Sequence, residues 1–551
     1  MRMIDSPTSR SGSRAVAIAR LARTCIASLL VGVPVAQSAT IAGTVRGPDG
    51  AAFRGAFVAA ENSKTKITVS VLSNPQGHYR IPDLPAGDYQ LFIRALGYNA
   101  NPQTTTLTAN QSRSSDFAIR RSPAQWGDVS GYAAKTLFPA GKMRDLIVQK
   151  CSICHFFQNR WVPLNFDAAG WKTRVEYMKA LGAVDINPKD EADLATYLAS
   201  LFGPDSVLPK SPEQAPGYQD TLRPVTDAAL NIVYVEYEMP QPRYMPFAPY
   251  PDAKTGFVWI PNHGTTNKIT RLDPKTGAMQ DFAVPSTDAA FIHSAVPAPD
   301  GSVWLAEAGR SRALGRWDPA TQKITEYVDT LEGHTAGPGD RAELTGGIGQ
   351  RHTVRVDPNG NVWSSAKPLA KLDPKTGQYT NFFAAAFTYD IQIAANGDVW
   401  FTFPAANKID KVDAKTLKLS MWGMPTPNMY PRRMAIAADG TIWVGENAFP
   451  FGVGKLARFD PKTEQIKEYS LPGPDPSPYA IGFDGDGYLW YNSHYMDTIN
   501  RFDTKTGKVV EYPYPHAEMM GREFFSDAKG RVWYSSNTNN KVGYFYLAPK
   551  P

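Results

Sequence analysis

Cysteine is scarce in this sequence, occurring only three times among 551 residues. Cys25 lies in an N-terminal segment that we expect to be removed, so the mature chain keeps only Cys151 and Cys154. These two cysteines share one short motif. Their number therefore excludes a framework of several disulfides.

Long apolar runs are also missing. The longest, residues 25–36, is about half of the ~20 residues that a membrane-spanning helix needs. Arginines precede this run, and Ala36-Gln37-Ser38 places small residues at the expected cleavage position of a signal peptide. The sequence therefore predicts a signal peptide over residues 1–38, a periplasmic or secreted protein, and no membrane span in the mature chain.

The mature chain lacks a strong excess of one charge. The formal net charge is +6, but five arginines against Asp5 supply +4 of it within residues 1–38. The remaining lysines and arginines are interleaved with acidic residues and form no continuous basic stripe. This distribution argues against nucleic acid as a partner.

Residues 39–121 contain short β-branched runs between turn signals, a spacing that predicts a small all-β sandwich. This region resembles the carboxypeptidase regulatory-like domain at Gly43-Thr-Val45, Gly77-His78-Tyr79, Leu84-Pro-Ala-Gly87, Tyr89 and Gly97-Tyr98. The resemblance implies an immunoglobulin-like or transthyretin-like sandwich that serves in adhesion, spacing or docking and has no catalytic residues.

Residues 126–203 change to helical spacing and contain the run Cys151-Ser-Ile-Cys154-His155. Covalent haem attachment requires this spacing, because two thiols about one helical turn apart add to the vinyl groups and the next histidine reaches the iron. A redox dithiol would need a βαβ context. A zinc site would need further cysteine or histidine ligands, and the region offers neither.

This helical region resembles a mono-haem cytochrome c, with a helix, the motif, a variable loop and a C-terminal helix. The resemblance implies a small all-α cytochrome c domain that carries one covalent haem c. Cys151 and Cys154 would attach the haem, and His155 would be the proximal ligand of its iron.

Met178 is the expected distal ligand of the haem iron, because Met143 precedes the motif on the same expected helix and faces elsewhere. Thioether ligation stabilises reduced iron. Two alternatives stay open. Met178 shares a helical face with Trp171 and Val175 and would then be core, or the sixth position of the iron is open or holds water.

Residues 231–551 form a repeat array that follows a Pro-rich linker over residues 204–230. The repeat is Asp-x-x-Gly-x-φ-Trp, followed by an Asp-Pro-x-Thr-Gly turn and a Glu-Tyr-φ-φ-Pro strand. Its tryptophans are Trp259, Trp304, Trp363, Trp400, Trp443, Trp490 and Trp533. The spacing is typical of four-stranded propeller blades. We therefore predict a multidomain, mainly β protein that ends in a seven-bladed β-propeller.

The ends of the array predict how the ring closes. The last repeat stops after its third strand, and Ile232–Pro240 reads as a fourth strand that precedes the first repeat. Pairing this early strand into the last blade would close the ring and cover both edges.

Two sets of polar residues recur at equivalent repeat positions. Eleven residues before the tryptophans lie His293, His352, Tyr389, Arg432, Tyr479 and Arg522. Just after the tryptophans lie His263, Glu307, Glu446, His494 and Asn537. Loops at these positions share one face of a propeller, so we expect a ligand site there. Its candidate catalytic residues are His293, His352, Glu307, Glu446, His494 and Arg432.

The repeats resemble the virginiamycin B lyase family, whose members open a cyclic depsipeptide by metal-assisted elimination. The family pattern has a histidine eleven residues before the tryptophan, a glutamate three after it, and another glutamate two before the histidine. His293 and Glu307 match, but Phe291 replaces the second acid. His352 matches, but Gln350 and Ala366 replace both acids. A divalent metal in the propeller would therefore have one carboxylate ligand and bind weakly.

Three hypotheses follow for the function. In the first, an exported c-type haem protein transfers electrons, and its propeller binds a small-molecule substrate or a redox partner protein. In the second, the propeller face is a metal-assisted lyase. In the third, the chain is a non-enzymatic binding module of the cell surface, as the sandwich domain suggests.

The haem assignment predicts the outcome of one substitution. Cys151→Ser removes one of the two thioether bonds, so covalent haem recovered with the purified protein should fall strongly or disappear. The pyridine haemochrome assay measures this quantity. An unchanged haemochrome yield in the variant would contradict attachment at this residue.

Overall fold

The computed structural model describes most of the chain that follows the N-terminal segment. The described residues are 38–152, 158–180, 186–287, 289–309, 311, 313–329, 335–336, 351–367, 369–382, 387–449 and 452–549. Residues 1–37 of the expected signal peptide lie outside them, as do Cys154 and His155.

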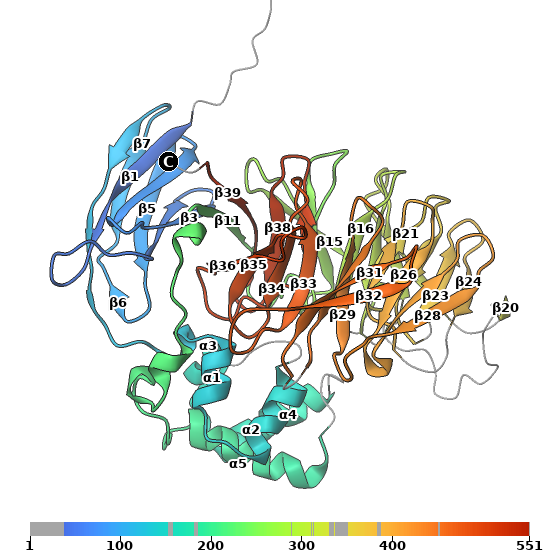
Figure 1. The fold of residues 1–551 in the computed structure, drawn as a ribbon, viewed down its shortest axis with the longest axis horizontal. Helices are drawn as coiled ribbons and strands as arrows, with labels where there is room; N and C mark the ends of the chain where they lie inside the picture. The colour runs from blue at the N-terminus through green and yellow to red at the C-terminus, as the bar shows by residue number, and fades with distance from the viewer. Residues whose placement is uncertain are drawn as a thin grey trace, which may run out of the picture. The chain divides into compact units, whose positions relative to one another are not determined.

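The N-terminal domain is an immunoglobulin-like arrangement of short strands (Figure 1). Its core consists of buried apolar residues, many of them β-branched or aromatic. Its strands are β1 (Ala39–Arg46), β2 (Phe57–Asn62), β3 (Thr68–Leu72), β4 (His78–Leu84), β5 (Gly87–Arg94), β6 (Tyr98–Asn99), β7 (Gln103–Leu107), β8 (Ser112–Ser114), β9 (Phe117–Ala118) and β10 (Arg120–Arg121). One sheet has the order β4-β1-β8, with β9 also on β1, and the other begins β7-β5-β2-β3.

The C-terminal region consists of successive antiparallel sheets. The first three comprise β12 (Tyr250–Pro251), β13 (Val258–Pro261), β14 (Lys268–Leu272) and β15 (Met279–Ala283); β16 (Ile292–Pro297), β17 (Val303–Glu307), β18 (Ala313–Trp317) and β19 (Ile324–Val328); and β21 (Val354–Val356), β22 (Val362–Ser364), β23 (Leu369–Asp373) and β24 (Gln378–Phe382) with β20 (Thr335–Ala336) beside β24.

Three further sheets follow in the same order along the chain. They comprise β25 (Ile391–Ile393), β26 (Val399–Phe403), β27 (Lys408–Val412) and β28 (Leu419–Gly423); β29 (Pro431–Ile436), β30 (Ile442–Glu446), β31 (Lys455–Asp460) and β32 (Gln465–Ser470); and β33 (Pro478–Phe483), β34 (Leu489–Ser493), β35 (Thr498–Phe502) and β36 (Val509–Pro513). The final strands are β37 (Phe525–Ser526), β38 (Val532–Ser536) and β39 (Lys541–Leu547).

These sheets are arranged as in a propeller (Figure 1). The first strand of each sheet contacts the first strand of the next, from β12 through β16, β21, β25, β29 and β33 to β37. β37 in turn contacts β12, where the rings of Tyr250 and Phe525 lie 4.3 Å apart. The first strands therefore line a common axis, and the ring of sheets is closed.

Strand β11 (Ile232–Glu238) completes the last sheet, as the sequence predicted. It pairs antiparallel with β39 along its whole length, from Ile232 opposite Leu547 to Glu238 opposite Lys541. Its other edge pairs with β3 of the sandwich, with Val233 opposite Val71, a pairing that the sequence did not predict. One eight-stranded sheet thus runs from β7 of the sandwich to β37 of the propeller.

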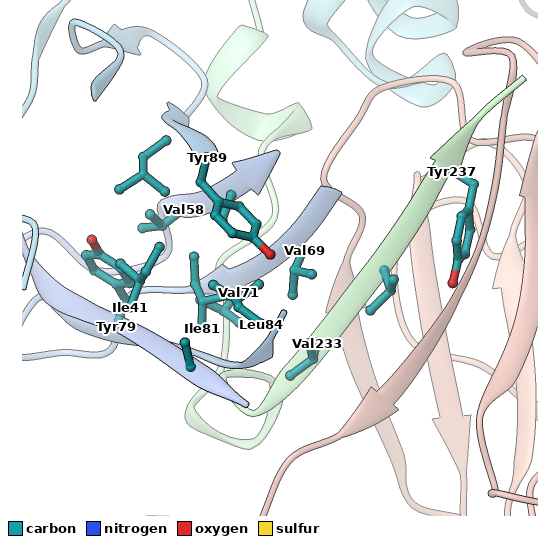
Figure 2. Packing of buried hydrophobic residues seen from close by; sticks show 14 of the residues in the cluster. Ile41, Val58, Val69, Val71, Tyr79, Ile81, Leu84, Tyr89, Val233 and Tyr237 are labelled. Carbon is teal, nitrogen blue, oxygen red and sulfur yellow. The ribbon is translucent and has the colours of Figure 1, made fainter. Parts of the chain in front are cut away.

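Apolar packing follows this shared sheet. Figure 2 shows Val69 and Val71 of the sandwich beside Val233 of β11, with Ile41, Ile81 and other buried residues farther to the left. The same cluster continues to Tyr237, which stacks on Trp533 with the ring centroids 6.1 Å apart. The sandwich and the last propeller sheet therefore share one hydrophobic core.

The segment between them is helical. Its elements are η1 (Trp126–Asp128), α1 (Gly131–Leu137), α2 (Lys142–Leu146), the π-helical turn η2 (Ile147–Cys151), α3 (Gln158–Trp161), η3 (Val162–Leu164), α4 (Ala168–Ala180), α5 (Pro188–Phe202), η4 (Pro212–Gln214), η5 (Tyr218–Thr221) and η6 (Asp227–Ala229). Ser130 caps α1 and Asn187 caps α5 with side-chain hydrogen bonds. The Pro-rich segment contributes Ala215 and Tyr218 to the core of these helices. Among the described residues, no helix is both long and apolar enough to span a membrane.

A buried polar network joins the sandwich to the propeller at β11. The carboxylate of Glu236 lies 2.8 Å from Nε2 of His516 and accepts a hydrogen bond from the Tyr514 hydroxyl at 2.9 Å. Arg94 of β5 donates to Nδ1 of His516 at 2.7 Å. Burial would raise the pKa of Glu236, but His516, Lys541 and Arg94 lower it to about 2.

Glu236→Gln should destabilise the protein, because it leaves Arg94 without a buried negative charge. We expect a loss of about 3 kcal/mol in the free energy of unfolding at neutral pH, measured by urea denaturation. The pKa of Glu236 falls from 4.5 to about 2 on folding. Its stabilisation is therefore fully present above about pH 4.5 and is lost as the pH falls toward 2.

Glu238→Gln on the same strand is the matched control, because Glu238 is exposed and lies 3.9 Å from Lys541. It should change the free energy of unfolding by less than about 0.5 kcal/mol. This role of the network is contradicted if Glu236→Gln lowers the free energy of unfolding no more than Glu238→Gln does. It is also contradicted if the effect of Glu236→Gln does not decrease as the pH falls toward 2.

Candidate functional site

Three of the expected histidines meet at the axis: His293 lies in the inner strand β16, His263 follows β13, and His352 precedes β21. The ring centroids of His293 and His352 lie 3.6 Å apart, and those of His263 and His293 lie 5.4 Å apart. Phe247 stacks on His263 with the centroids 4.1 Å apart. All three imidazoles come from different sheets, so the ring of sheets is what places them in contact.

These histidines are neutral at physiological pH. Burial lowers the pKa of His293 and of His352 well below the ordinary value, and the nearby Arg433 guanidinium lowers both further. Burial and Arg522 lower the pKa of His263 to about 3. The cluster therefore offers neutral imidazole nitrogens, which can accept or donate hydrogen bonds and can bind metals.

Aromatic and cationic side chains continue the cluster across the axis. The ring of His352 lies 4.2 Å from that of Tyr389, whose hydroxyl contacts the hydroxyl of Tyr479. Tyr479 stacks on His494 with the centroids 5.0 Å apart. Arg432 lies over the rings of both tyrosines. His293, His352, Arg432 and His494 thus belong to one axial cluster, together with Tyr389 and Tyr479.

Below this cluster lies a layer of paired charges. Arg433 makes ion pairs of 3.0 Å with both Asp390 and Glu523. Arg355 lies 2.7 Å from Glu523 and 4.0 Å from Asp390. Two cations thus face two carboxylates in a buried setting, where charges are stable only when they are paired.

Irregular strands explain how neighbouring residues reach the same site. The register shifts between Ile292 and Ser294 in β16, between Pro431 and Met434 in β29, and between Pro478 and Ile481 in β33. A bulge interrupts the alternation of side chains along a strand. Arg432 and Arg433 are consecutive in sequence, yet both take part in the axial cluster and its charge layer.

Glu307 and Glu446 lie elsewhere. Ser286 donates to Glu307 at 3.2 Å, and the neighbouring charge of Glu307 is Glu326 on the outer strand β19. Glu446 has Glu468 and Lys455 of the outer strands as its charged neighbours. Each acid follows its tryptophan by three residues and so points to the opposite face of the strand. Their partners therefore come from within the sheets, and neither acid joins the histidines.

Both acids are fully buried. Burial raises the pKa of Glu307 to about 7 and that of Glu446 to about 8. Neither oxygen of Glu446 has a hydrogen-bond partner among the described residues. In the same part of the chain, no group of three or more His, Cys, Asp or Glu side chains is placed to hold a metal ion.

The end of the cysteine-bearing helical turn packs against this face of the propeller. Ser152 is buried beside Cys151, its hydroxyl lies 3.4 Å from the Tyr495 hydroxyl, and its backbone is hydrogen bonded to His494. Val148 packs with Tyr495 and Met520 of the propeller. Lys135 of α1 forms an ion pair of 2.5 Å with Asp475. These contacts bring the described start of the Cys-x-x-Cys-His motif to the edge of the axial cluster.

Met178 lies near the C-terminal end of α4. Its side chain is half-buried, and it is not among the residues of the helical core, which Trp171 and Val175 do join. Met520 is a second methionine to consider, since it is buried against Val148. No local sequence pattern selects Met520, because it lies 372 positions after Val148 in the chain.

Two family models match this chain, one in the N-terminal β region and one in the C-terminal β region. The model of the carboxypeptidase regulatory-like domain matches residues 40–120, and that of the virginiamycin B lyase family matches residues 341–548. Both resemblances read from the sequence are thereby confirmed for those residues. No curated protein matches the chain.

Solved structures with a similar fold include a streptogramin B lyase. It is 22% identical, with a TM-score of 0.50 over 59% of this chain and 100% of the other. Virginiamycin B lyase from Staphylococcus aureus, in selenomethionine form, is 20% identical, with a TM-score of 0.49 over 57% of this chain and 100% of its own. At this identity the likeness to streptogramin B lyase shows the fold of the propeller-like region.

The raised pKa of Glu446 predicts a pH-dependent effect of Glu446→Gln. In the folded chain Glu446 stays protonated up to about pH 8, whereas its ordinary pKa is 4.5. Folding therefore costs more as the pH rises from about 4.5 toward 8. The glutamine variant avoids this cost. At pH 8 its free energy of unfolding should therefore exceed that of the wild type by about 1 kcal/mol, which raises its thermal midpoint. Near pH 4.5 the two midpoints should be equal.

Glu468→Gln is the matched comparison, because Glu468 pairs with Lys455 at 2.6 Å and has a lowered pKa. It should destabilise the protein at pH 8. A thermal midpoint of Glu446→Gln that stays below the wild type at pH 8 would contradict the buried neutral state of Glu446.

Proposed function

We propose that this protein is an exported c-type haem protein that transfers electrons, and that its propeller holds a small substrate or a redox partner beside the haem. One observation supports this most strongly. The helical turn that ends at Cys151 packs through Ser152 on His494 and Tyr495, and His494 belongs to the axial cluster. A haem attached at this turn would lie close to the cluster.

The residues around the attachment point suit a haem. Cys151 is half-buried against the helical core, and Val148 anchors the same turn on Tyr495 and Met520 of the propeller. Cys154 and His155 supply the second thiol and the imidazole by sequence. A haem held by this set would accept and release one electron at its iron. The chain's own residues would position it and exclude water from one side.

Met178 remains our proposed distal ligand of the iron, with Met520 as the alternative from the propeller. A methionine ligand gives oxidised haem a weak sulfur-to-iron band at the red end of the spectrum. The band would disappear in the alanine variant of whichever methionine is the ligand, which distinguishes Met178→Ala from Met520→Ala.

The remaining parts fit the same proposal. We propose that the sheets form a seven-bladed propeller completed by β11, and that residues 1–38 direct export to the periplasm or beyond. The sandwich then acts as a spacer or docking domain, as in the hypothesis of a non-enzymatic cell-surface module. Its strand β3 covers the edge of β11, so it also has a structural role within the propeller.

A lyase at the propeller face is the second candidate, and the match to the virginiamycin B lyase family favours it. His293 would be the base in this reaction, with a divalent metal bound nearby. The position of Glu307 speaks against a complete family site, because its partners are Ser286 and the outer strand β19 rather than the histidines.

One pair of variants distinguishes the two candidates. For the redox function, His293→Ala should leave the haemochrome yield unchanged while slowing haem reduction by a substrate-containing extract at least about tenfold. For the lyase, turnover of a cyclic depsipeptide should depend on added Mg²⁺ and be lost in both His293→Ala and Glu307→Ala. Failure of every extract to reduce the wild-type haem would reject the redox function.

A further inference from the structure

Arg432 is a buried cation for which the described residues supply no carboxylate partner. Its side chain is surrounded by the rings of Tyr389, Tyr430, Tyr479 and Phe449, whose centroids lie 4.8 to 5.2 Å from its guanidinium carbon. The residue is 4% exposed. One Nη donates to the Tyr389 hydroxyl at 3.0 Å, whereas Nε has no acceptor among the described residues.

Arg433, the next residue, is a buried arginine whose charge is neutralised by carboxylates of the protein. Arg433 makes ion pairs with both Asp390 and Glu523. No carboxylate of the described residues lies within ion-pair distance of Arg432. Removing a guanidinium from water without a counter-charge is strongly unfavourable. Cation–π contacts with aromatic faces offset only part of this cost.

A second arginine shares the same aromatic wall. The guanidinium carbon of Arg522 lies 5.1 Å from the centroid of Tyr479 and 5.1 Å from that of Phe247. Arg432 lies 5.2 Å from the centroid of Tyr479. The Tyr479 ring is therefore flanked by two buried guanidinium groups, which together create a strongly positive potential at the axis.

Tyr479 responds to this potential. Burial would raise the pKa of its hydroxyl, but Arg522, Arg432 and Arg433 lower it below the ordinary value. The protein thus favours a negative charge at this position even on a phenol. An oxyanion with a lower intrinsic pKa would satisfy the same field better.

We propose that Arg432 and Arg522 form an anion-binding site at the propeller axis, and that its ligand is a carboxylate on a small, flat organic body. Guanidinium groups bind carboxylates through paired, charge-assisted hydrogen bonds. The aromatic walls of Tyr389, Tyr430, Tyr479 and Phe449 suit an apolar ring beside the carboxylate. The inference deepens the proposed function, on which it rests, by naming the ligand class of the propeller face.

The carboxylate has two conceivable sources. A free substrate would supply it, or a haem attached at Cys151 would supply it through a propionate group, since the helical turn of Cys151 packs on His494. The two sources share one chemistry, and a haem-free form of the full chain distinguishes them. Cys151→Ser with Cys154→Ser supplies that form.

Calorimetric titration with sodium benzoate at constant ionic strength tests the site. Benzoate should bind the haem-free chain at least about tenfold more tightly than benzamide, its neutral analogue. Arg432→Gln should weaken benzoate binding by about tenfold or more, and Arg432→Lys by less. Arg271→Gln is the matched control, because Arg271 also stacks on aromatic rings but on the half-exposed strand β14. It should bind benzoate as the wild type does.

The two forms of the chain identify the source of the carboxylate. If benzoate binds both the haem-carrying wild type and the haem-free variant, the ligand is a free anion. If benzoate binds only the haem-free variant, the haem propionates fill the site in the wild type. Equal affinity for benzoate and benzamide in the haem-free chain overturns the proposal, even if Arg432→Gln does not fold. A haemochrome assay on the same samples measures haem attachment separately. If the wild-type chain carries no haem, the proposed function is rejected, and the benzoate titration still decides whether the anion site exists.

Discussion

The pairing of β11 on both of its edges is the constraint on which the rest of the structure depends. On one side β11 completes the last propeller sheet through β39, and on the other it pairs with β3 of the sandwich. Strand β11 ties the ends of the ring together, because it belongs to the last sheet and precedes the first sheet in the chain. An unpaired strand edge would also invite aggregation. Glu236 fixes the same strand through His516 and Arg94. The sandwich is therefore a structural part of the ring as well as a separate domain.

Closure of the ring brings polar side chains of different sheets together at the axis. Three different sheets bring His263, His293 and His352 into one buried group. Local bulges let consecutive residues serve different purposes, since Arg433 is neutralised by Asp390 and Glu523 while Arg432 rests on aromatic rings. One side of the cluster therefore consists of neutral histidines, and the other side carries the positive charge of Arg432. Ser152 connects the positive side, through His494, to the segment that we propose carries the haem.

The sequence predicted those features that repeat or lie close together along the chain. Seven tryptophans marked the sheets, and the orphan strand at Ile232 was assigned correctly to the last of them. The pairing of β11 with β3 was missed, because contacts between residues about 160 positions apart leave no local pattern. Arg433 and Glu523 were also missed, since ordinary strand alternation would point them away from Arg432 and Arg522. Glu307 and Glu446 were grouped with the histidines by repeat position, yet their side chains point into the sheets.

The central claim is that the proposed haem and the axial cluster of the propeller form one functional unit. The reduction potential of the haem in the wild type and in Arg432→Gln tests this claim most directly, with Arg271→Gln as the control. Removing a buried positive charge near the iron favours the oxidised state, so the potential should fall in Arg432→Gln and stay unchanged in the control. Equal potentials in all three proteins would show that the haem and the cluster act independently, and a wild-type chain without haem would contradict the account altogether.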